Sequence, residues 1–119
     1  MKIFLRTGIF VAIMGYAKER GKLEKLLTKL VGVNIYNEKG LVALNDCHEN
    51  YSHTVRILKN KEPELFTELY KKELQEVKDA KKTINPEDAI EDRQNKFNAY
   101  KDVIVNAIEK TIAKTNETN

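Results

Sequence analysis

The sequence predicts an all-α protein, an antiparallel bundle of three to four helices, and two observations carry this prediction. The first is composition: Lys and Glu dominate the polar residues, while the 119-residue chain has five glycines, two prolines and no tryptophan. Long unbranched side chains lose little rotamer freedom in a helix, so this mixture favours helices. The second is that apolar residues recur every three to four positions, the spacing of one helical face. We expect a single domain over residues 1–119.

The first regular helical pattern begins at Lys22, and Gly32 is well placed to end the helix. Gly15 and Gly21 argue against a longer helix that would also include the preceding residues. The expected buried stripe of this helix consists of Leu23, Leu26, Leu27, Leu30 and Val31.

Residues 1–20 form an apolar N-terminal segment. Residues 1–18 contain three basic residues and no acid, and Ile9–Met14 is uninterrupted apolar sequence. The run is too short for a transmembrane helix, which needs about 20 apolar residues. A secretory signal with residues 15–17 as its cleavage site is one interpretation, and a retained organellar import segment is another. The preferred interpretation is a segment buried in a core or interface, and we expect its apolar run to dock on neighbouring protein.

Residues 33–44 are the one stretch whose pattern differs from a helix. Two apolar runs, 33–36 and 41–44, flank a four-residue turn that ends in Gly40. This arrangement predicts a short hairpin-like or extended excursion from the bundle.

Three further helix starts are predicted after residue 44. Asp46 with Glu49 three residues later is a variant capping box, and it predicts a second helix that ends near Lys61. Pro63 suits the first turn of a third helix. Asn85 and Pro86, with two acids after them, predict the start of a last helix that frays over residues 115–119. The expected buried residues are Cys47, Tyr51, Thr54, Val55 and Leu58, then Phe66, Leu69, Tyr70, Leu74, Val77, Ala80 and Ile84, then Ile90, Phe97, Tyr100, Ile104, Ala107, Ile108 and Ile112.

The sequence offers no set of residues for metal binding or nucleophilic catalysis. The only histidines, His48 and His53, would point about 140° apart on a helix, and Cys47 about 120° from His53. No CxxC or HxxxH spacing accompanies them, so we expect surface or half-buried polar residues. We therefore predict no catalytic residues, no cofactor-binding residues, no metal ligands and no cofactor, in a protein that is not an enzyme.

Two acidic pairs, Glu73 with Glu76 and Asp88 with Glu91, leave one enzymatic alternative. All-α nucleotide pyrophosphatases hold Mg²⁺ with paired acids on facing helices, an oxygen shell that suits this cation. Because Glu73 and Glu76 are expected to flank the core and lysines surround them, solvated helix acids are the preferred interpretation.

A local basic cluster raises the question of nucleic-acid binding. Four acids are interspersed with its lysines, so we expect a salt-bridged helix surface and no nucleic-acid partner. The lysines are Lys71, Lys72, Lys78, Lys81 and Lys82, and the acids are Glu68, Glu73, Glu76 and Asp79.

Two blocks of the sequence resemble a known family. The first joins the Thr-Gly and apolar run of residues 6–14 to the leucine pattern of residues 19–30, with Thr-Lys near its end. The second combines residues 90–92, 102–107 and 112–114. These blocks are similar to the first and last helices of NADH dehydrogenase 1 alpha subcomplex subunit 5, an accessory subunit of respiratory complex I. Tyr51 is similar in place to a tyrosine that opens the family's middle helix.

The resemblance implies a non-catalytic accessory subunit of NADH:ubiquinone oxidoreductase. It would lie on the matrix side of the inner mitochondrial membrane, peripheral to it, and contact other protein subunits of the peripheral arm without a small-molecule substrate. Residues 33–44 and part of 62–85 depart from the family as additions, Gly21 is an insertion, and the family's Gly-Gln pair and Trp-containing tail are missing.

One alternative function belongs to a different class. Small, Lys-rich helical bundles also occur as stand-alone interaction proteins, such as immunity, inhibitor or adaptor proteins of a prokaryote or phage. The sequence therefore predicts a protein-binding role in either case.

Overall fold

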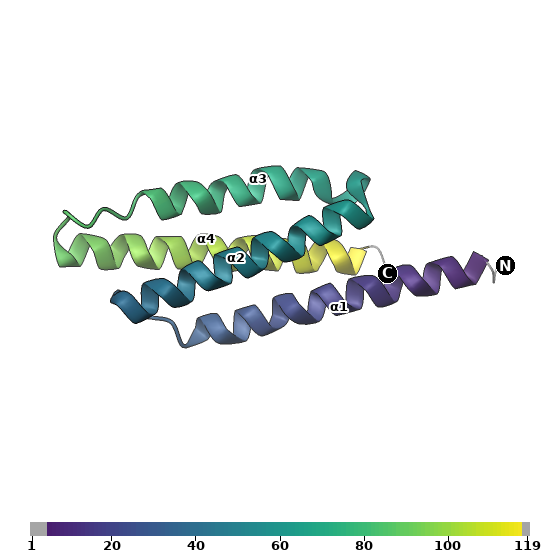
Figure 1. Ribbon diagram of the computed structural model, residues 1–119, viewed down its shortest axis with the longest axis horizontal. Helices are drawn as coiled ribbons and strands as arrows, with labels where there is room; N and C mark the ends of the chain where they lie inside the picture. Colours follow the sequence, from purple (N-terminus) through teal and green to yellow (C-terminus); the bar gives the residue numbers. More distant parts are fainter. Residues whose placement is uncertain (1–4, 118–119) are drawn as a thin grey trace.

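The computed structural model describes residues 5–117, with side chains from Tyr16 onward. This part of the chain forms four α-helices and no strand, so the predicted all-α bundle is confirmed (Figure 1). The helices are α1 (Leu5–Val31), α2 (Glu38–Lys61), α3 (Pro63–Lys82) and α4 (Ile90–Glu117).

Successive helices run in opposite directions, and α2 and α4 contact each other across the bundle while α1 and α3 flank them (Figure 1). The first turns of α1 extend beyond the ends of the other three helices. The side chains of Ile9–Met14, which we expected to form a docking patch, lie outside the described residues.

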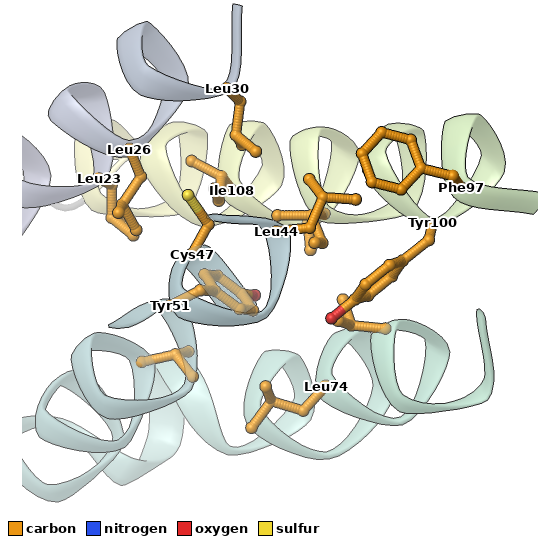
Figure 2. Packing of buried hydrophobic residues seen from close by; sticks show 14 residues of the cluster. Leu23, Leu26, Leu30, Leu44, Cys47, Tyr51, Leu74, Phe97, Tyr100 and Ile108 are labelled. Atoms are coloured by element: carbon orange, nitrogen blue, oxygen red, sulfur yellow. The ribbon is translucent and has the colours of Figure 1, made fainter. Parts of the chain in front are cut away.

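The core forms where the apolar stripes of all four helices meet, as the 3–4 spacing predicted (Figure 2). Leu23 and Leu30 of α1 pack between α2 and α4, and Leu74 approaches from α3. Cys47, the single cysteine, is fully buried among them, and burial raises the pKa of its thiol. The other buried members of this cluster are Leu26, Leu44, Tyr51, Val55, Val77, Phe97, Tyr100, Ile104, Ala107 and Ile108.

The helix α1 runs without a break through Gly15 and Gly21, against our expectation of an interruption. Tyr16, Glu19 and Leu23 follow one another at helical spacing and are all buried. Burial of this continuous face outweighs the cost of about 1 kcal/mol that a glycine adds to a helix interior.

The described end of the 1–20 segment packs on its own bundle, where Tyr16 and Glu19 are buried. The ring of Tyr16 meets that of Phe66 edge-on, with 5.7 Å between centroids. Burial, together with a hydrogen bond to Glu62, raises the pKa of Tyr16 to about 12. These contacts join α1 to the α2–α3 turn.

The expectation of a hairpin over residues 33–44 is wrong, because α2 already begins at Glu38. The Asn37 side chain caps the helix, and its Oδ1 accepts a hydrogen bond from the Gly40 N–H at 2.6 Å. Leu41 and Leu44 are three residues apart and both contact the core, a helical period that we took for an extended run.

The predicted starts of α2 and α4 are also wrong, whereas Pro63 does begin α3 and Lys61 does end α2. Asp46 lies in the interior of α2, so it cannot cap it. Asn85 holds a separate turn, since its Oδ1 accepts from the Glu87 N–H at 2.9 Å, and α4 begins only at Ile90. The strong capping signal at residues 85–88 therefore serves the α3–α4 connection.

The C-terminal end of α4 does not fray as expected within the described residues. The helix continues to Glu117, and Thr115 is fully buried. Arg20 of α1 donates to Thr115 Oγ1 at 3.0 Å and to its backbone oxygen at 3.2 Å. This tertiary contact fixes the last described turns of α4 against α1.

Candidate functional site

Four large apolar side chains are exposed in the part of the chain that the structure describes. Val31 is 73% exposed, Ile35 66%, Val42 54% and Ile90 72%. They come from the end of α1, the α1–α2 loop, the second turn of α2 and the start of α4, which lie at one end of the bundle (Figure 1). We call these four residues the apolar end.

Val31 and Ile90 were expected in the core stripes, and this expectation is wrong. Each is a terminal residue of its helix and is exposed. Ile35 and Val42 were expected in a hairpin. The apolar end is drawn from four separate places in the sequence, and helical periodicity alone could not have assembled it.

The loop that carries Ile35 is fastened to α4 on both sides of that residue. Gln94 Oε1 accepts a hydrogen bond from the Tyr36 N–H at 2.7 Å, and Gln94 Nε2 donates to the Asn34 carbonyl at 3.1 Å. Lys101 Nζ donates to Asn34 Oδ1 at 2.8 Å. Ile35 is therefore exposed on an ordered support, with its two neighbours fixed.

Packing inside the loop adds to this order. A Cβ atom at Gly40 would overlap the Ile35 carbonyl oxygen and press on the ring of Phe97, so only glycine fits here without a shift. The Tyr36 ring meets Phe97 edge-on at 5.9 Å, and the Arg93 guanidinium lies 5.4 Å above Tyr36. The loop thus has its own small aromatic anchor on α4.

A shallow hollow of about 300 Å³ opens beside Ile35. Lys39 is the one charged residue in its wall. A single side chain of a partner would find apolar walls and one cation there. The hollow is lined by Gly32, Val33, Asn34, Ile35, Asn37, Lys39, Gly40 and Ala43.

The histidines and the cysteine do not converge. His48 is 8% exposed, so the expectation of a surface or half-buried position is wrong for it, whereas His53 is exposed. His48 Nδ1 lies 3.0 Å from the Tyr100 hydroxyl, which donates to Asn45 Oδ1 at 2.9 Å. Among the described residues no group of three or more His, Cys, Asp or Glu side chains could hold a metal ion.

Two acids of the enzymatic alternative form ion pairs with lysines of α4. Glu73 is 4% exposed and faces α4, where Lys110 Nζ lies 3.5 Å from its Oε1, so it is not the solvated acid that we expected. Glu76 is exposed, and Asp88 pairs with Lys96 at 2.6 Å. Glu73 has a structural partner in the bundle.

The basic cluster of α3 differs from the expected salt-bridged surface. Within the described residues, none of its five lysines has an ion pair, although acids lie beside them in sequence. Glu73 faces α4, and Asp79 accepts a hydrogen bond from Gln75. Lys78 and Lys81 instead face α2, near His48.

The fold and this surface define a four-helix bundle with a closed core and an ordered apolar end. Comparison of the chain with protein-family models, with curated proteins and with solved structures finds no match. Along the described residues, none of the helices combines the length and the apolar character that a bilayer crossing requires.

Proposed function

We propose that this protein is a non-catalytic binding protein that docks on other proteins through its apolar end. In its specific form, the proposal is an accessory subunit of respiratory complex I on the matrix side of the peripheral arm. The observation that carries the binding role is the exposure of Ile35 on a loop whose flanking residues are hydrogen-bonded to α4.

Isolated exposed apolar side chains are ordinary on protein surfaces, but this group has two further properties. All four large exposed apolar residues of the described part lie at the same end of the bundle. The loop between α1 and α2 is held in one conformation, which lowers the entropy lost when a partner binds. Ordered apolar anchors that fill a partner's pocket supply most of the energy of many interfaces.

The specific form rests on the resemblance of residues 6–30 and 90–114 to the complex I family. These two blocks correspond to α1 and α4, which pack side by side in the bundle. The Arg20–Thr115 hydrogen bonds join them near the C-terminus of α4. The resemblance of both helices supports the proposal. Helix α3, part of which departs from the family, lies on the far side of the α2–α4 pair from α1.

The experiment is co-migration with complex I. Tagged full-length protein expressed in the source organism is followed by blue-native electrophoresis and mass spectrometry of the complex I band. We expect the unaltered chain in this band and loss of the double variant Ile35→Asp/Ile90→Asp. Absence of the unaltered chain from the band refutes the specific form of the proposal.

Ala113→Asp provides a matched control, because Ala113 is exposed on α4 far from the apolar end. We expect this variant to co-migrate normally. All three proteins should unfold within about 0.5 kcal/mol of one another, as surface substitutions usually do. Equal loss of both variants from the complex would show that the apolar end is not the docking surface.

A stand-alone interaction protein is the second candidate, and the closed core favours it. Large core side chains such as Leu44, Tyr51 and Phe97 are fully buried within this one chain. A bundle of this kind needs no companion to cover its core. Purified protein that is a stable monomer and forms a stoichiometric complex with one enzyme, outside complex I, would support this candidate.

A further inference from the structure

Basic side chains from two helices gather along one side of the bundle, where α2 and α3 meet. Arg56 and Lys59 come from α2, and Lys78 and Lys81 come from α3. We call these four residues the basic strip. Within each helix the two members are three residues apart, so they lie on one helical face.

Tyr70 lies at one end of the basic strip. Lys59 Nζ is 4.4 Å from the centroid of its ring, a cation–π distance. A hydrogen bond from Arg56 lowers the pKa of Tyr70, and the charges of Lys59 and Lys78 act in the same direction. The ring therefore holds two cations of α2 together at the α3 surface.

Lys78 and Lys81 lie at the other end, next to His48. Burial is the main reason that the pKa of His48 is lowered, and the charges of these two lysines lower it further. Glu49 is the one acid that acts on His48 in the opposite sense. Three cations thus act on Tyr70 and two act on His48.

None of the four residues of the basic strip has an ion pair within the described part of the chain. The ion pairs of the bundle are elsewhere. Glu19 forms an ion pair with Lys61, and Glu73 forms one with Lys110 on the side of α3 that faces α4. Like charges that are brought together without compensation repel one another. A ligand with carboxylates would relieve this repulsion.

We propose that the basic strip docks an acidic α-helix of a partner protein along the face where α2 and α3 meet. Tyr70 and Lys81 are separated by about 16 Å of helix, at 1.5 Å per residue. Carboxylates at positions i, i+4, i+7 and i+11 of a partner helix share one face and span the same length. The inference extends the proposed protein-binding function and concerns a different surface from the apolar end.

A protein helix suits this surface better than a nucleic acid. Single-stranded nucleic acid is bound by a series of aromatic rings on which bases stack. Here Tyr70 is the one ring at the strip, and Lys59 already covers one of its faces.

The test uses the full-length chain and a synthetic helical peptide as the probe. The peptide carries glutamates at i, i+4, i+7 and i+11 in an alanine-rich background with a fluorescent label, and binding is measured by anisotropy. A permuted peptide of the same composition has its glutamates spread around the helix. We expect the patterned peptide to bind at least about fivefold more tightly than the permuted one.

Arg56→Glu/Lys78→Glu reverses two charges of the basic strip. We expect at least about a tenfold loss of peptide binding in this variant. Lys18→Glu/Lys25→Glu is the matched control. It makes the same net charge change on two exposed lysines of α1 that have no ion pair with any described residue. At physiological salt, where screening acts over about 8 Å, this control should bind within about twofold of the unaltered chain.

Three results would overturn the inference. These are equal binding of the two peptides, equal loss in the two charge-reversal variants, and tighter binding of a single-stranded oligonucleotide to the same residues. Ile35→Asp/Ile90→Asp should bind the peptide normally, so failure of the apolar end and failure of the basic strip are distinguishable. Circular dichroism of each variant confirms that the bundle is intact.

Discussion

The hydroxyl of Tyr100 on α4 lies 3.0 Å from Nδ1 of His48 on α2, inside the bundle. This hydroxyl has one proton, which it donates to Asn45 Oδ1 at 2.9 Å. It can therefore only accept from His48, and Nδ1 of the neutral imidazole must carry the proton. The two helices are joined by a hydrogen-bond chain with a defined direction.

We expect the stability of the protein to fall as the pH drops from about 7 to about 5. Burial lowers the pKa of His48 from its ordinary 6.5, and Lys78 and Lys81 add to this effect. The unfolded chain therefore binds a proton more readily than the folded one. The contribution to stability is complete above pH 6.5 and is lost as the pH falls through the lower folded-state value.

Urea unfolding across this pH range measures the effect. His48→Gln removes the titrating group, so its stability should depend less on pH than that of the unaltered chain. His53→Gln is the control, because His53 is exposed. An unchanged pH dependence in His48→Gln would contradict the assignment.

A second buried pair links the same helices and predicts non-additive mutations. Tyr51 and Thr111 are fully buried with 2.9 Å between their hydroxyl oxygens, and Thr111 also donates to the Ala107 carbonyl. Tyr51 must therefore donate to Thr111. Thr111→Val removes the acceptor and should cost about 1–3 kcal/mol of unfolding free energy, because a buried hydroxyl loses its partner.

Tyr51→Phe/Thr111→Val should be less destabilised than the sum of the two single variants. In the double variant no buried hydroxyl of the pair remains to be satisfied. A double-mutant cycle by urea unfolding measures the coupling. Strict additivity would show that the two hydroxyls do not interact in solution.

Two glycines should respond in opposite ways to alanine. Gly21 has no atom within 4 Å of an added Cβ, so Gly21→Ala should stabilise α1 by about 0.5–1 kcal/mol. Gly40→Ala should destabilise the protein by about 1–3 kcal/mol, because the new Cβ overlaps the Ile35 carbonyl. Thermal and urea unfolding of both variants test this contrast, and stabilisation by Gly40→Ala would contradict the loop geometry.

The buried Glu73 and the exposed Lys110 form an ion pair, and replacing either residue should lower the stability by a different amount. Lys110 is 55% exposed and Glu73 is 5% exposed at the side chain. Lys110→Met leaves a buried carboxylate without its cation and should cost about 1–2 kcal/mol after allowance for solvent screening. Glu73→Gln removes the charge itself and should cost less. Urea midpoints compare the two, and any nucleotide hydrolysis should be the same in Glu73→Gln.

Much of the bundle was predictable because burial follows helical period. Leu23 and Leu30, or Phe97 and Ile104, lie where their spacing placed them. The α1–α2 connection was not predictable in this way, because the apolar run 41–44 is short enough to suit either a strand or a helix. Capping by Asn37 decides for the helix. Contacts of the loop with α4, which are distant in sequence, add to this local cap.

The apolar end and the basic strip were harder to predict from the sequence than the core. Val31 and Ile90 continue their apolar stripes, yet both are exposed where their helices end or begin. Lys78 and Asp79 are adjacent in sequence, yet α3 turns them in different directions, so the neutralisation that composition suggested does not occur. Both surfaces depend on which helix lies next to which.

The reactivity of Cys47 can be used to measure how often the helices of the bundle separate. It is the one thiol of the chain, it is fully buried, and its raised pKa keeps it in the unreactive thiol form. A thiol reagent can modify it only when α1, α2 and α4 separate. The labelling rate of the unmodified natural sequence therefore reports how often the bundle opens, and it would slow whenever a bound partner holds the helices closed.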